Sequence, residues 1–241
     1  MSRTVKIIIG IVAAVALAAA VGFLYVYVSG GSGEASAPLT AEAVDVTEGA
    51  TVFTIMPEES LVSFELDEVL MGQPKTVVGT TDQVAGQISV NPASPAESQM
   101  GTIEVNVRTL ETDSSMRDRT IRGQVLQSAQ DEFEFVRFIP GEITGMPESV
   151  AVGEPFSFQV TGDLVIKAIT QSVTFDVTVT AVSEDRIEGS AQTTITRSMY
   201  ALTIPNAPNV ADVEEEVLLT IEFVAVAGES VEATAEATAG A

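Results

Sequence analysis

Alternation of apolar and polar residues is the feature of this sequence that most constrains its fold. In residues 173–179, four apolar residues alternate with three polar ones, and residues 62–66, 103–107, 156–166 and 217–223 show a similar pattern. A period of two places successive side chains on opposite faces of a β-strand, so each run predicts a strand with one buried face. Several such strands, separated by Pro-, Asn- and Asp-containing breakers, are typical of an antiparallel sandwich or closed barrel.

Only residues 113–128 have a helical pattern. Asp113 is a suitable N-terminal cap, and Met116, Ile121 and Val125 recur with loose helical spacing. Gly123 and three arginines predict that this helix is short. The predicted fold class is therefore all-β with one short helix, in addition to the N-terminal segment described next.

An uncharged segment at the N-terminus predicts a transmembrane helix. Residues 7–28 form a run of 22 residues without a charge. At ~1.5 Å per residue, such a helix spans the ~30 Å hydrocarbon layer of a bilayer. Arg3 and Lys6 precede the run, and the next basic residue is Lys75. By the positive-inside rule, the N-terminus is cytoplasmic and the rest of the chain is extracytoplasmic.

Tyr25 and Tyr27 lie near the outer end of this run, where amphipathic rings favour the membrane interface. The alternative is a signal peptide that is cleaved near small residues such as Ala35 or Ala37, which would release a secreted domain. The length of the run favours the uncleaved anchor. Both interpretations export the domain.

Composition divides the chain into four parts. Residues 1–28 are a cytoplasmic stub and the transmembrane anchor, and residues 29–49, rich in Gly, Ser and acidic residues, are predicted to be a flexible linker. Residues 50–227 contain the alternating runs and form the β-domain. Residues 228–241 are an acidic, Ala-rich tail that is predicted to be disordered.

Charge and missing residue types exclude several functions. The net charge is −23, and all 34 acidic residues follow the apolar run, so nucleic-acid binding is excluded. The chain has no Cys and no His, which excludes Ser-His-Asp, Cys-His and His-rich zinc sites. The acidic run 214–216 lacks the pattern of a calcium loop. No spacing singles out a catalytic carboxylate pair, so we predict no enzyme activity, no catalytic residue, no cofactor and no metal site.

Local strings resemble a known family. Residues 162–167 read Gly-Asp-Leu-Val-Ile-Lys, and residues 173–175 read Val-Thr-Phe, in an order similar to a strand hairpin of the YceI-like family. Thr112-Asp113 followed by Arg117-Asp118 is similar to the strand end and helix start of that family. The resemblance covers residues 50–227. The sequence departs from the family pattern at several positions, including Glu134, where the family has a proline.

The resemblance implies an antiparallel lipocalin-like β-barrel that binds polyisoprenoids. It implies a non-enzymatic carrier of a long isoprenoid-type lipid, such as a quinone or a polyprenyl compound. Phenylalanines on the predicted strands are candidates for an apolar lining, namely Phe64, Phe135, Phe156, Phe158 and Phe175. Arg117 and Asp118 are candidates for headgroup recognition or for a structural tie between the helix and the barrel.

Two questions stay open at this level. Phenylalanines on inward strand faces are equally suited to a ligand tunnel and to a solid core. The alternative function is therefore an extracytoplasmic interaction or structural module with a solid barrel core. The sequence also leaves open whether the protein forms a homodimer, what headgroup and tail length the ligand has, and whether the anchor is cleaved.

Overall fold

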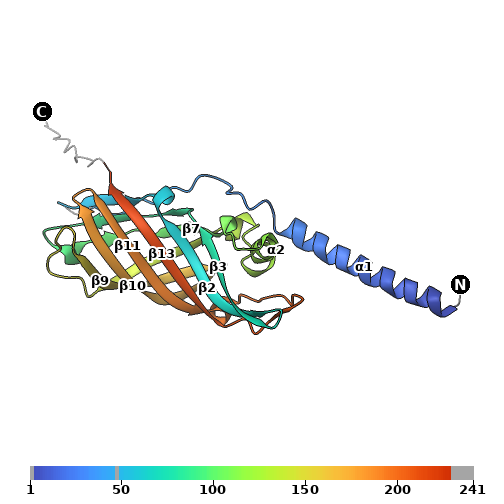
Figure 1. Ribbon diagram of the computed structural model, residues 1–241. Helices are drawn as coiled ribbons and strands as arrows, with labels where there is room; N and C mark the ends of the chain where they lie inside the picture. Colours follow the sequence, from blue (N-terminus) through green and yellow to red (C-terminus); the bar gives the residue numbers. More distant parts are fainter. Residues whose placement is uncertain (1–2, 47–48, 229–241) are drawn as a thin grey trace, which may run out of the picture.

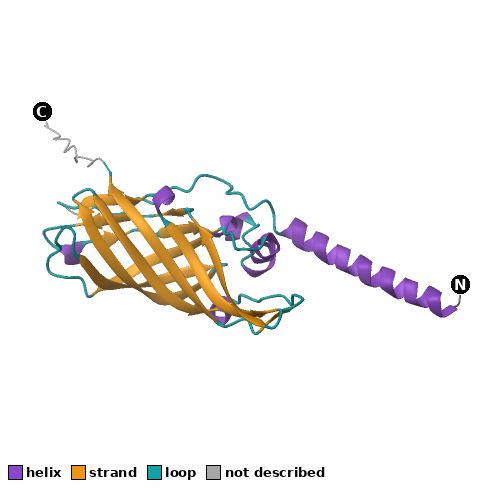
Figure 2. Cartoon of the chain, viewed as in Figure 1, coloured by secondary structure: helices purple, strands orange, loops and turns teal. Residues whose placement is uncertain are grey.

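The computed structural model describes residues 3–46 and 49–228, which form a long N-terminal helix and an antiparallel sheet curled into a barrel (Figures 1 and 2). The tail that we predict to be disordered falls almost wholly outside the described residues. The helices are α1 (Arg3–Ser29) and α2 (Ser115–Thr120), and α2 continues into a π-helical turn, Ile121–Val125. Short 3-10 turns lie at Pro57–Glu59, Pro95–Glu97, Val107–Thr109, Asp131–Phe133 and Arg197–Tyr200.

The strands account for most of residues 50–227. They are β1 (Thr51–Ile55), β2 (Leu61–Leu70), β3 (Gln73–Thr81), β4 (Val84–Ala85), β5 (Gln87–Val90), β6 (Gln99–Met100), β7 (Ile103–Asn106), β8 (Phe135–Thr144), β9 (Pro155–Ile166), β10 (Ile169–Ser183), β11 (Arg186–Thr196), β12 (Val210–Ala211) and β13 (Glu216–Ala227).

The strands pair in the order β4-β7-β8-β9-β10-β11-β13-β1-β5-β6. Strand β13 also pairs with β2, which in turn pairs with β3. Because β3 runs into β4 through Asp82 and Gln83, the ring closes through β2, β3 and β4 onto β7. Every named pairing is antiparallel. The predicted antiparallel, lipocalin-like barrel is confirmed.

Alternation along the strands decides which side chains enter the barrel. On β10, Val173, Phe175, Val177 and Val179 are buried, whereas the intervening residues are exposed. Strand β9 repeats the pattern, and its register with β10 runs without a shift from Ile166 to Pro155. This agreement is expected, since a slip of one residue would turn every apolar side chain outward.

The short helix is present, but the predicted cap is wrong. Helix α2 begins at Ser115, with Ser114 in the N-cap position. The Asp113 carboxylate instead forms ion pairs with Lys75 and Arg117, so it is not available to the first turn of the helix. We call residues 115–125, which combine α2 with the π-helical turn, the rim segment.

Helix α1 projects away from the barrel (Figure 1). Its segment Ile11–Ser29 is long and apolar enough to cross a membrane, and none of it is buried in the protein. A signal sequence near the N-terminus can meet the same criterion. Residues 31–46, which follow α1, contain neither helix nor strand but contact the barrel. Ser36 donates two hydrogen bonds to the Glu134 carboxylate, and the Val44 amide donates to Gln87 Oε1 at 3.2 Å.

Candidate functional site

A cavity of about 530 Å³ opens at one end of the barrel. It lies between inward side chains of β2, β3, β7–β11 and β13, and the rim segment and residues 202–213 border its opening. The inward side chains that line it are mainly aliphatic and include Val62, Leu66, Val77, Val105, Leu110, Leu164, Ile195, Val217 and Leu219. This volume is within the range of small-molecule sites. The cavity contradicts the alternative of a solid barrel core.

Two of the five predicted phenylalanines line this cavity, and three do not. Phe64 and Phe175 are part of the lining. Phe156 and Phe158 stack on each other, with ring centroids 5.9 Å apart, and belong to the packed core. Phe135 is half-buried beside the Arg137 guanidinium, which lies 5.7 Å from its ring centroid.

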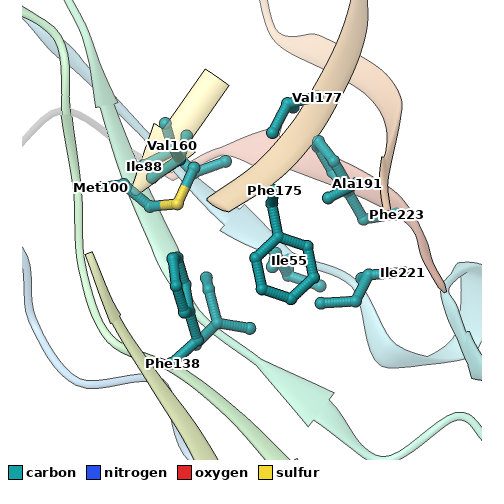
Figure 3. A pocket seen from close by; sticks show the side chains of 11 residues that line it. Ile55, Ile88, Met100, Phe138, Val160, Phe175, Val177, Ala191, Ile221 and Phe223 are labelled. Carbon is teal, nitrogen blue, oxygen red and sulfur yellow. The ribbon is translucent and has the colours of Figure 1, made fainter. Parts of the chain in front are cut away.

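An aromatic pair forms part of the inner end of the cavity. Phe138 and Phe175 meet edge to face, with centroids 4.9 Å apart and ring planes at 66°. Both rings also border a deeper void of about 40 Å³. Figure 3 shows this deeper space, with Met100, Ile88 and Val160 around it. The pair therefore lies between the ligand-sized cavity and a void with less than a tenth of its volume.

The polar groups of the cavity concentrate at its opening. On β2, the inward row Val62, Phe64, Leu66 continues to Glu68, which is 7% exposed. A buried carboxylate is costly without a partner, and Arg117 NH2 lies 2.9 Å from Glu68 Oε1. Arg117 also pairs with Asp113, and Asp113 pairs with Lys75. These four side chains all line the opening, and their charges balance.

Asp118 does not line the cavity. Its Oδ1 accepts hydrogen bonds from the Thr112 amide at 2.8 Å and from Thr112 Oγ1 at 2.6 Å. These bonds fix the start of the rim segment to the chain that enters it. Arg117 and Asp118 are therefore not joined in one site: Arg117 ties the rim segment to β2 at the opening, and Asp118 ties it to the preceding loop.

The other arginines of this region also have protein partners. Arg108 Nε donates to the Ser128 carbonyl at 2.7 Å, and Arg108 NH1 lies 3.1 Å from Glu134. Arg137 pairs with Glu104 on the neighbouring strand β7. Among the described residues, no group of three or more carboxylates is placed to hold a metal ion.

Comparison with known proteins identifies the family. The sequence profile of the YceI-like domain matches residues 53–225, which include every residue of the cavity lining. The chain belongs to the YceI-like family. No curated protein matches the chain significantly.

Solved structures share this YceI-like fold. A polyisoprenoid-binding domain from Saccharophagus degradans, implicated in plant cell wall breakdown, has a TM-score of 0.58 at 15% identity, and the match covers 74% of this chain and 99% of that one. BcnA of Burkholderia cenocepacia has a TM-score of 0.54 at 21% identity, covering 70% and 98%. The YceI protein of Campylobacter jejuni has a TM-score of 0.51 at 17% identity, covering 63% and 84%.

The sequence did not reveal Glu68 or Phe138 as parts of this YceI-like cavity. Glu68 carries a signal that could have been used, because it is a charged residue at an inward position of an alternating row. Phe138 carries a weaker signal. Its strand contains Pro140 and Gly141 and has a register shift between Pro140 and Glu142, which obscure the alternation.

Proposed function

We propose that this YceI-like protein binds a long isoprenoid-type lipid in its barrel, without catalysis, on the outer side of the cytoplasmic membrane. The observation that carries the proposal is the cavity of about 530 Å³, lined by aliphatic side chains and closed at its inner end by packed core. The protein from Saccharophagus degradans that shares this fold is a polyisoprenoid-binding domain, and this likeness supports the same class of ligand.

Burial of an apolar tail supplies enough free energy for binding. Each buried methylene contributes about 0.8 kcal/mol, so ten contribute roughly 8 kcal/mol. A binding free energy of that size corresponds to a dissociation constant of about 1 μM before the entropic costs of association. A tail in this cavity therefore needs no charged anchor to be held, and most of the affinity comes from its length.

The opening favours an uncharged polar headgroup. The three cations that line the cavity, Lys75, Arg117 and Arg197, already pair with carboxylates. A phosphorylated headgroup would have to compete with these carboxylates for the cations and would approach the negative charges of Glu68 and Asp113. A quinone-type headgroup offers carbonyl oxygens that can accept hydrogen bonds without adding charge.

The N-terminal helix supports a membrane setting. Arg3 and Lys6 lie in its first turn, and its last turn has no basic residue, as expected for a cytoplasmic N-terminus. We infer that α1 remains as a single-pass anchor, because its apolar run is longer than the core of a usual signal peptide. The YceI-like barrel then lies outside the cytoplasm.

A matched pair of variants on β3 tests lipid binding. Val77 is 3% exposed and lines the cavity, whereas its neighbour Val78 points outward and is 42% exposed. We expect Val77→Trp to fill the cavity and Val78→Trp to leave it open. The purified full-length proteins would be washed, extracted with organic solvent, and the extracts quantified by mass spectrometry.

The expected result is one isoprenoid per protein in the wild type and in Val78→Trp, and a decrease of about tenfold or more in Val77→Trp, equivalent to about 1.4 kcal/mol. Circular dichroism would confirm that both variants are folded. A folded wild-type protein that repeatedly yields no stoichiometric lipid would contradict the proposal.

A further inference from the structure

We propose that the open end of the barrel is held against the outer surface of the bilayer that contains α1, so that lipid enters the cavity directly from that membrane. The inference rests on the proposed function for its anchor and its ligand. It adds a membrane-contacting surface, formed by the rim segment and the β2–β3 turn, whose partner is the lipid bilayer itself.

The first observation is that the outer end of α1 packs on the rim segment. Arg122 Nε donates to the Gly30 carbonyl at 2.9 Å. Arg119 NH1 donates to the carbonyls of Tyr27 and Gly31 at 3.2 and 3.3 Å. The last carbonyls of a helix have no partner within the helix, and its C-terminal end carries partial negative charge. The last turn of α1 contains no basic residue of its own, so the rim segment supplies the cations.

Close backbone approach supports this contact on both sides. A Cβ atom on Gly30 would lie 2.7 Å from Arg119 Cα, and a Cβ atom on Gly123 would lie 2.8 Å from Ser29 Oγ. Both distances are shorter than real Cβ contacts. Glycine at these two positions therefore lets the two helical segments touch, and larger side chains would separate them.

The second observation is that the same rim segment forms the opening. Met116, Arg117, Thr120 and Ile121 line the cavity, while Arg119 and Arg122 face α1. The Arg119 guanidinium lies 4.0 Å from the centre of the Tyr27 ring. An interfacial tyrosine marks the headgroup level of a bilayer. The opening is thus about one helix diameter, ~10 Å, from that level.

The third observation is exposed apolar surface at this end. The β2–β3 turn projects from the same end of the barrel as α1 (Figure 1), and Met71 at its tip is 76% exposed. Met116 on the rim segment is 39% exposed. A flexible apolar side chain at a loop tip beside a membrane anchor suits insertion between headgroups. The bilayer is the occupant that α1 itself brings to this surface.

Tryptophan fluorescence can test the orientation, because the chain contains no Trp. Met71→Trp places a single probe at the β2–β3 turn, and Gln73→Trp is a second probe beside it. Val152→Trp is the matched control, since Val152 is 60% exposed and lies between β8 and β9, at the opposite end of the barrel. The full-length proteins would be reconstituted in phosphatidylcholine vesicles whose acyl chains carry bromine.

We expect bromine to quench Met71→Trp or Gln73→Trp about threefold more than Val152→Trp, because interfacial residues reach the acyl boundary. In the Met71→Trp background, Gly30→Leu should reduce this difference, whereas Gly22→Leu should not, because a Cβ atom on Gly22 would meet no atom within 4 Å outside the adjoining helix backbone. Equal quenching at both ends of the barrel would overturn the inference.

Lipid extraction from the same samples separates the two proposals. Bound isoprenoid with equal quenching at both ends would overturn the membrane contact and leave lipid binding intact. Strong quenching at Met71→Trp without bound lipid would support the membrane contact and contradict the carrier function on which direct entry depends.

Discussion

At the scale of single residues, the contact between Phe138 and Phe175 lies at the inner end of the cavity. The two rings border both the large cavity and the void of about 40 Å³ behind it. A tail that reaches this pair must stop or displace a ring, and displacement is costly in a core packed at crystal density. The pair is therefore expected to limit the length of tail that fits.

Truncation of one ring tests this limit. We expect Phe175→Ala to join the two spaces, to destabilise the protein by about 3–5 kcal/mol, and to shift the extracted lipids toward longer tails. Phe158→Ala is the control, because Phe158 is 9% exposed in the core but lines neither space. It should lower stability similarly without changing the lipid masses.

Mass spectrometry of both extracts gives the lipid masses, and denaturant unfolding gives the free energy of unfolding of each variant. Identical lipid masses in both variants would contradict the limit.

At the scale of elements, Glu134 holds the segment after α1 on the barrel. Its side chain is 1% exposed. It accepts hydrogen bonds from the Ser36 amide at 2.8 Å, from Ser36 Oγ at 2.5 Å and from Asn106 Nδ2 at 2.8 Å. Burial by itself raises the pKa of Glu134, but these hydrogen bonds and the charge of Arg108 outweigh burial and hold the pKa below its ordinary value of 4.5.

This lowered pKa predicts a dependence of stability on pH. A carboxyl with a lower pKa in the folded state stabilises the fold above its unfolded pKa, and that contribution is lost as the pH falls through the folded pKa. We expect Glu134→Gln to lower the free energy of unfolding by about 3 kcal/mol at pH 7, with the difference from wild type shrinking below about pH 4. Glu132→Gln, at an exposed neighbouring position, should change little. Urea unfolding between pH 7 and 3 gives the free energy of unfolding of the wild type and of both variants. If this free energy depended on pH in the same way in the two variants, Glu134 would not be the source of the dependence.

Elements were predictable where a local pattern decides them. Strand β10 follows from its alternation alone. The start of α2 was mispredicted because the Asp113 carboxylate binds Lys75, which is distant in sequence. Glu134 was recognised only as a departure from the family pattern. A carboxylate is needed at this position because it binds Ser36, which lies 98 residues earlier, and no local sequence pattern predicts a contact over that distance.

At the scale of the whole molecule, the family resemblance predicted the barrel but not its interior. Inward aliphatic side chains suit a core and a cavity equally, and the difference depends on whether their summed volumes fill the ring. The packing of α1 on the rim segment was also beyond prediction. It requires Gly30 to lie against Arg119 and Gly123 to lie against Ser29, residues that are about 90 positions apart in sequence, and glycine alone carries no signal of its partner.

Net charge is the remaining property that belongs to the whole molecule. Of the 30 acidic residues that the structure describes, only eight take part in ion pairs. Repulsion among the others therefore acts against the compact state, and salt screens it within about 10 Å at 0.1 M. Salt also weakens exposed ion pairs, but each of these contributes at most about 1 kcal/mol.

Because repulsion involves more groups than attraction, added salt should stabilise the protein. We expect an increase from 0.05 to 0.5 M NaCl to raise the melting temperature by about 3 °C, which corresponds to about 1 kcal/mol for a domain of this size. Thermal unfolding followed by circular dichroism measures the shift. The Glu134→Gln variant separates the two effects. It removes the buried ion pair between Glu134 and Arg108, which salt screens little, so its loss of stability relative to wild type should persist at both salt concentrations. A melting temperature that falls with salt would mean that the ion pairs at the opening, rather than surface repulsion, dominate the electrostatic free energy of folding.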